Sequence, residues 1–89
     1  MSEKVKEVQD GGFAEAIRTG VVLVDFWAPR CGPCRLQGPI LEEVASTVGD
    51  KAMIVKVNID ENPKAAEAFD FKSIPTLILL KDGEVMLQF

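Results

Sequence analysis

The chain has 89 residues, of which 47% are hydrophobic, and its formal net charge at pH 7 is −4. This size suits one small domain over residues 1–89, and the scattered basic residues form no patch for nucleic acid. No apolar stretch reaches membrane-spanning length and the N-terminus opens no signal-peptide pattern, so we expect a cytoplasmic protein.

Apolar spacing alternates between strand and helix periods along the chain. Val5 and Val8 indicate a short first strand, and Asp10 is expected to cap a helix that ends at Gly20. Residues 21–26 are apolar on both faces apart from one aspartate, which is typical of a central strand.

A long helix is expected over residues 33–48. Pro39 lies inside it, removes one backbone hydrogen bond and is expected to kink it. The side chains expected to face the core are Leu36, Ile40, Leu41, Val44, Ala45 and Val48.

The second half of the chain predicts a strand over residues 52–60 and a short helix capped by Asn62. Two further strands, over residues 76–80 and 84–89, flank an Asp-Gly turn that favours a hairpin. Apolar alternation predicts that one face of the last strand contacts the core. The element order predicts an α/β fold with a mixed central sheet and helices on both faces.

The segment Cys31-Gly32-Pro33-Cys34 comes shortly after the predicted central strand, and the chain has no other cysteine. Two intervening residues place both sulfurs on one side of a helical turn, and Pro33 suits the first helical position. Free N–H groups and the helix dipole stabilise a thiolate there. We therefore expect Cys31 to be the attacking thiol and Cys34 the resolving thiol of a redox-active pair that needs no cofactor.

Other interpretations of this cysteine pair have less support. Four-coordinate zinc needs two further Cys or His ligands that the chain does not contain, so no metal site is expected. Haem attachment needs a histidine where Arg35 stands. A structural disulfide across so short a loop would constrain the unfolded chain little. Two inert buried thiols remain as an alternative.

Asp25 is the charged residue inside the predicted central strand, in phase with Val21 and Leu23. Burial there should desolvate its carboxyl group and raise its pKa. We interpret it as a general acid and base that takes the proton from Cys34. The alternative is a hydrogen-bonded structural aspartate.

The segment from Val24 to Arg35, followed by Pro39-Ile40-Leu41, resembles the active-site segment of thioredoxins. The predicted element order is similar to the thioredoxin fold over nearly its full length. The resemblance implies a protein-disulfide reductase that works with a thioredoxin reductase and with disulfide-containing protein substrates. An oxidising or isomerising variant and a non-catalytic fragment or binding module remain as alternatives.

The same resemblance implies a cis proline at Pro75 beside the dithiol, with Ile74 pairing with the backbone of an extended substrate. It also implies that Lys56, on the neighbouring strand, acts with Asp25 and limits its pKa shift. The candidate catalytic residues are Cys31, Cys34, Asp25 and Lys56, and the candidate substrate-binding residues are Trp27, Arg30, Gly32, Pro33, Ile74 and Pro75.

Two features depart from the thioredoxin pattern. Arg30 stands where most thioredoxins have tryptophan, and its charge is expected to favour the Cys31 thiolate and acidic docking surfaces, unless it is a neutral surface change. The chain ends at Phe89, where thioredoxins continue into a final helix. We therefore expect a fold without that helix, and either a homodimer formed through the uncovered sheet face or a chain that is only marginally folded.

Overall fold

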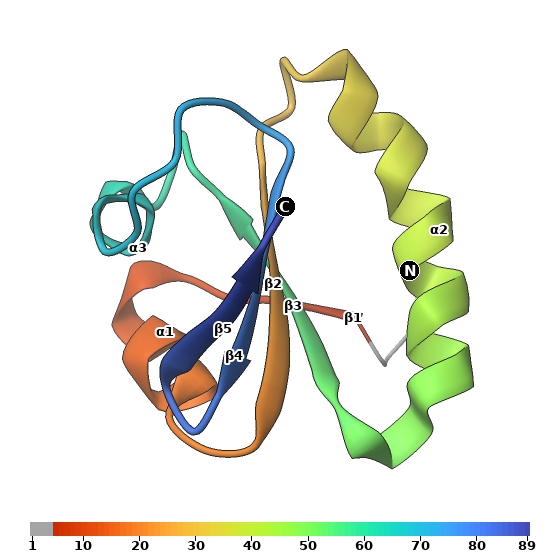
Figure 1. The fold of residues 1–89 in the computed structure, drawn as a ribbon. Helices are drawn as coiled ribbons and strands as arrows, with labels where there is room; N and C mark the ends of the chain where they lie inside the picture. Colours follow the sequence, from red (N-terminus) through yellow and green to blue (C-terminus); the bar gives the residue numbers. More distant parts are fainter. Residues whose placement is uncertain (1–4) are drawn as a thin grey trace.

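The computed structural model describes residues 5–89, which form a five-stranded mixed sheet with helices on both faces. Figure 1 shows α1 and α3 against one face of the sheet and α2 against the other. The elements are β1 (Val5–Glu7), α1 (Asp10–Ile17), β2 (Val21–Trp27), α2 (Gly32–Val48), the 3-10 turn η1 (Gly49–Lys51), β3 (Met53–Asn58), α3 (Pro63–Glu67), β4 (Thr76–Lys81) and β5 (Glu84–Gln88).

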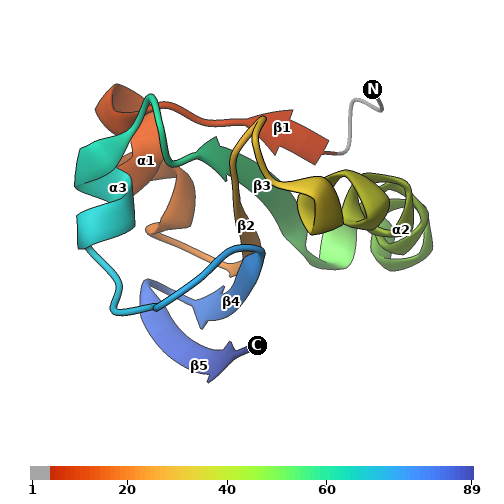
Figure 2. The same ribbon diagram turned by 90° about the horizontal axis from the view of Figure 1, so that it is seen from above.

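The strand order is β1-β3-β2-β4-β5, which places β2 at the centre of the sheet. β1 and β2 both run parallel to β3, whereas β4 is antiparallel to β2 and to β5. The predicted mixed sheet is therefore confirmed, and Figure 2 shows α1 and α3 on one side of it and α2 on the other, next to β1 and β3. The hairpin turn is at Asp82 and Gly83, which both have positive φ, as the Asp-Gly pair predicts.

The main core lies between the sheet and the layer formed by α1 and α3. Val22, Val24 and Phe26 of β2 face it, and the Phe26 ring lies 5.7 Å from Phe69 and 4.9 Å from Phe71, centroid to centroid. A smaller cluster on the other face packs α2 against β1 and β3. Because β2 pairs with β3 on one side and β4 on the other, the sheet fixes the position of its carboxyl end at Trp27, shortly before Cys31.

The outer face of α2 is more exposed than the apolar spacing predicts. Leu41 and Ala45 are buried, but Leu36, Ile40 and Val44 are 76%, 58% and 37% exposed, so the prediction that they face the core is wrong. A helix lying on a sheet buries one narrow row of side chains, and the predicted stripe is wider than that row.

β5 lies at the edge of the sheet and all five of its residues are exposed. The expectation that one of its faces contacts the core is therefore wrong as well. β5 pairs only with β4 among the described strands, and α2 packs on the other side of the sheet, against β1 and β3. No helix within residues 5–89 is long and apolar enough to span a membrane.

The helix caps at Asp10 and Asn62 are exchanged between two helices. The Asp10 carboxylate accepts hydrogen bonds from the N–H groups of Lys64 and Ala65 in α3, at 3.3 and 2.8 Å. Asn62 Oδ1 accepts one from the Asp10 N–H in α1, at 2.8 Å. Asp10 therefore caps α3 and not its own helix, contrary to the prediction. This exchange ties the segment after β3 to the start of α1.

Removing either exchanged cap should destabilise the domain. We expect Asn62→Ala to lower the free energy of unfolding by about 2 kcal/mol, because Asn62 is 2% exposed and its loss leaves the part-buried Asp10 N–H without its partner and removes the side-chain hydrogen bond to the Asn58 carbonyl. Asp10→Ala should cost about 1 kcal/mol. Urea denaturation measures both, and the exposed Asp50→Ala serves as control, with an expected change below about 0.5 kcal/mol. If Asn62→Ala and Asp10→Ala changed the free energy of unfolding as little as the control does, the exchanged capping would be contradicted.

Candidate functional site

The cysteine segment connects the carboxyl end of β2 to the first turn of α2. Cys31 is the N-cap residue of α2, and the helix begins at Gly32, so Pro33 is its second residue. The backbone N–H groups of the first residues of a helix have no acceptor within it, so the missing N–H of Pro33 costs no hydrogen bond. Cys31 and Cys34 form a disulfide with their Cα atoms 5.3 Å apart.

The sulfur of Cys31 lies at the N-terminus of α2. Its Sγ accepts a hydrogen bond from the Cys34 N–H at 3.2 Å. In the reduced protein, this donor and the helix dipole favour a negative charge on the sulfur. Both cysteines are nearly buried, at 7% and 5% exposure, and apolar packing by Trp27, Ile59 and Ile74 opposes that charge. The arrangement suits a thiol that ionises at its helix terminus.

Asp25 projects from β2 and is 1% exposed. Burial raises the pKa of its carboxyl group from 3.8 to about 6, while the charge of Lys56 and a hydrogen bond from Gln37 lower it and Glu7 raises it. The direction agrees with the prediction from its place in the strand. Oδ1 accepts the hydrogen bond from Gln37 Nε2 at 3.2 Å, whereas Oδ2 is buried and has no partner among the described residues.

Gln37 was not among the candidate residues. It follows Cys34 by three positions, so both side chains lie on the same side of α2. The spacing from Cys34 is the signal that the sequence offered, but the side of α2 that faces Asp25 is visible only in the structure.

Lys56 is the register partner of Asp25 on β3. Its Nζ lies 4.8 Å from the centroid of the Trp27 ring, a cation–π contact. None of the ion pairs found within residues 5–89 joins Lys56 to Asp25. Lys56 therefore acts on Asp25 through its charge and not through direct contact. Trp27 packs against the cysteines and beneath this cation.

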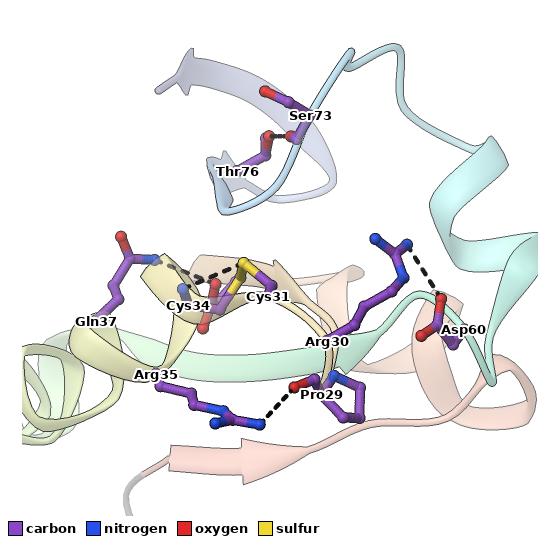
Figure 3. The surroundings of a disulfide bond; sticks show 10 residues. Pro29, Arg30, Cys31, Cys34, Arg35, Gln37, Asp60, Ser73 and Thr76 are labelled. Carbon is purple, nitrogen blue, oxygen red and sulfur yellow. Dashed lines mark hydrogen bonds and ion pairs between the residues drawn. A yellow bond between two sulfur atoms is a disulfide. The ribbon is translucent and has the colours of Figure 1, made fainter.

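The Ile74–Pro75 peptide bond is cis, as the resemblance implies. The Ile74 side chain packs against the cysteine cluster. Its N–H and C=O take part in no backbone hydrogen bond within residues 5–89, so both are free to pair with another chain. The Thr76 hydroxyl donates a hydrogen bond to the Ser73 carbonyl, and Figure 3 shows this turn across from the disulfide.

Arg30 precedes the disulfide and its guanidinium extends toward Asp60 in Figure 3. Nη2 lies 3.2 Å from Asp60 Oδ1, and the two side chains are 64% and 45% exposed. Asp60 therefore offsets part of the cationic charge that was expected to act on Cys31. Arg30 also lines a pocket of about 400 Å³ with Ile59, Phe71, Lys72, Ser73 and Ile74.

Comparison with known proteins agrees with this geometry. The family model for thioredoxin matches residues 4–89. A thioredoxin of Staphylococcus haemolyticus is 52% identical over 80 residues, which cover 90% of this chain and 77% of that protein. A thioredoxin of Bacillus subtilis is 49% identical over 82 residues, which cover 92% of this chain and 79% of that protein.

The mixed sheet and the dithiol at the start of α2 define a thiol–disulfide oxidoreductase that reduces protein disulfides. The chain belongs to the thioredoxin family. Members of this family work with thioredoxin reductase and with disulfide-containing protein substrates.

Asp25 should make stability depend on pH. Its folded pKa of about 6 exceeds its unfolded value, so its contribution is fully present below about pH 4 and is lost as pH rises through 6. We expect the free energy of unfolding of Asp25→Ala at pH 8 to exceed that of the wild type by about 1–2 kcal/mol. That advantage should vanish at pH 4. Guanidinium melts at the two pH values measure it, and a variant that is less stable at both would identify Asp25 as a satisfied structural group.

Proposed function

We propose that the protein is a general reductase of protein disulfides in which Cys31 attacks and Cys34 resolves. The observation that carries this assignment is the hydrogen bond from the Cys34 N–H to Cys31 Sγ at the N-terminus of α2. The Cys31 thiolate bonds to one substrate sulfur and displaces the other as a thiolate. Cys34 then loses its proton, attacks Cys31 Sγ and releases the second substrate thiolate. The substrate gains two electrons, and the Cys31–Cys34 disulfide remains.

Asp25 is, in this proposal, the base that accepts the Cys34 proton directly or through one water. A carboxyl group with a pKa of about 6 exchanges protons readily near neutral pH. Its contact residue Gln37 lies one helical turn beyond Cys34, which supports proximity between the carboxylate and the resolving thiol. Lys56 contributes its charge to the same site.

The substrate lies across the exposed side of the disulfide as an extended segment. Its backbone pairs with the unpaired N–H and C=O of Ile74, as in the addition of a short strand. Such contacts read the backbone more than the side chains, which suits a broad range of substrates. The remaining substrate-contacting residues in this proposal are Trp27, Arg30, Gly32, Pro33 and Pro75.

The reduced state is regenerated by thioredoxin reductase, and the protein works as a single domain over residues 1–89 in the cytoplasm. In such a reducing compartment a cysteine pair is more often catalytic than structural.

A homodimer through the open face of β4 and β5 is the second part of this proposal. Leu87 pairs with Leu79 on the face that α2 leaves open, and Leu87 and Phe89 are 52% and 68% exposed. Apolar side chains in such a row favour association.

Charge substitution on β5 tests the dimer with a matched control. Leu87→Lys should convert the dimer to a monomer in light scattering at micromolar concentration. Val85→Lys lies on the same strand, pairs with Leu80 on the opposite face, and should leave the dimer intact. A wild-type protein that is monomeric at these concentrations would refute the dimer.

Trapping of the mixed disulfide tests the roles of the two cysteines. Cys34→Ser should accumulate a covalent adduct with an oxidised substrate protein such as insulin, because nothing resolves it, whereas Cys31→Ser should not. Mass spectrometry reads the adducts, and both variants should lose essentially all insulin reduction. Equal trapping by the two variants would overturn the assignment of attacking and resolving thiols.

A further inference from the structure

Gln37 is the hydrogen-bond donor that reaches the buried carboxylate of the site. Its Nε2 donates to Asp25 Oδ1 at 3.2 Å, and among residues 5–89 no other donor contacts that carboxylate. The side chain comes from the second turn of α2, the helix that also carries Cys34. The position of Asp25 is therefore coupled to the helix that holds the resolving thiol.

The contact leaves the two carboxylate oxygens in different states. Oδ1 is engaged by the amide, whereas Oδ2 is buried and unpartnered in the part of the chain that the structure describes. An unpartnered buried oxygen is costly, and protonation of that oxygen relieves the cost. Oδ2 is thus the atom on which a proton is most favourable.

The Gln37 amide can form a hydrogen bond with both the charged and the protonated form of Asp25. When Asp25 is charged, the Nε2–H donates to it, and after a flip the Oε1 can accept from the protonated acid. A lysine or arginine at this position would hold the charged form, and a leucine would disfavour it.

The other elements around Asp25 supply charge without contact. β3 contributes Lys56, whose Nζ lies over the Trp27 ring, and β1 contributes Glu7, the register partner of Lys56. β4 places Leu77, which carries no charge, opposite Asp25. Gln37, from α2, supplies the directional contact.

We propose that Gln37 is a positioning residue of the reductase: its amide holds Oδ1 of Asp25, so that Oδ2 faces the proton of Cys34. As Cys34 Sγ bonds to Cys31 Sγ and the substrate thiolate leaves, the Cys34 proton passes to Oδ2 and then to solvent. The amide of Gln37 gains and loses no proton. This inference rests on the proposed role of Asp25 and adds a residue to it.

Two substitutions of Gln37 test the proposal. Gln37→Leu removes the donor, and the Asp25 titration, followed by carboxyl carbon NMR, should move upward by about one pH unit. The rate at which a preformed mixed disulfide is resolved falls at low pH, and this acid limb of the pH profile should move upward with the titration. The rate at pH 6 should then be about fivefold lower than in the wild type. Gln37→Glu places a second carboxyl beside Asp25 and should move the limb further.

Gln88→Leu is the matched control. It removes another glutamine whose Nε2 donates a hydrogen bond, to the Asp70 carbonyl, at an exposed position on β5. This variant should leave the Asp25 titration and the pH profile unchanged. Thermal melts of all variants separate a loss of stability from a change in titration, since a merely structural glutamine would alter the melts alone.

Asp25→Asn separates this inference from the proposed function. If it flattens the acid limb while Gln37→Leu leaves the limb and the titration in place, the role of Gln37 is overturned and that of Asp25 stands. If Asp25→Asn leaves the limb unchanged, the proposed role of Asp25 fails, and with it the positioning role of Gln37.

Discussion

The chemistry of this protein depends on where the first turn of α2 begins. α2 starts at Gly32, after a short loop that follows the central strand, so Cys31 occupies the N-cap and its sulfur accepts a hydrogen bond from the Cys34 N–H. An N-cap normally uses a side-chain oxygen to satisfy that donor, and here a sulfur takes its place. The same contact completes the helix and stabilises the reactive charge, so a shift of the helix start by one residue would lose both.

The buried carboxylate is the part of the site that opposes folding. Asp25 lies in the most enclosed strand of the sheet, and the deprotonated form that accepts a proton is the form that burial disfavours. Lys56 and Gln37 offset that cost without removing it, because neither places a full ion pair on the carboxylate. An ion pair would have stabilised the fold and left the group permanently charged. The site thus keeps a carboxylate that burial destabilises and that can therefore accept a proton.

The charge of Arg30 was expected to act on Cys31, but the structure places an acidic partner beside it. Arg30 is adjacent to Cys31 in the sequence, but its guanidinium pairs with Asp60 from the turn after β3. Contact between these loops also shapes the pocket beside Ile74. Because both side chains are exposed, this ion pair is weak and an approaching substrate can displace it.

Local patterns were sufficient for the element order, the mixed sheet and the identity of the dithiol. The strand from Val21, the Cys-Gly-Pro-Cys segment and the Asp-Gly turn each depend on neighbours within a few residues, and each has the predicted structure to within one residue. The burial of Asp25 also followed from the pattern, since the residues of a central strand are buried regardless of which elements pack on its two faces.

Contacts between distant segments were decided only by the tertiary structure. The partner of Asp10 is 55 residues away at Ala65, and nothing in the local sequence separates a cap for its own helix from a cap for another. The exposure of Leu36 and Ile40 depends on the rotation of α2 over the sheet, which apolar spacing does not specify. Gln37 reaches Asp25 for the same reason: the helix rotation that exposes one row of side chains turns the next toward the central strand. Sequence periodicity determines which faces are apolar, and packing determines which of them is covered.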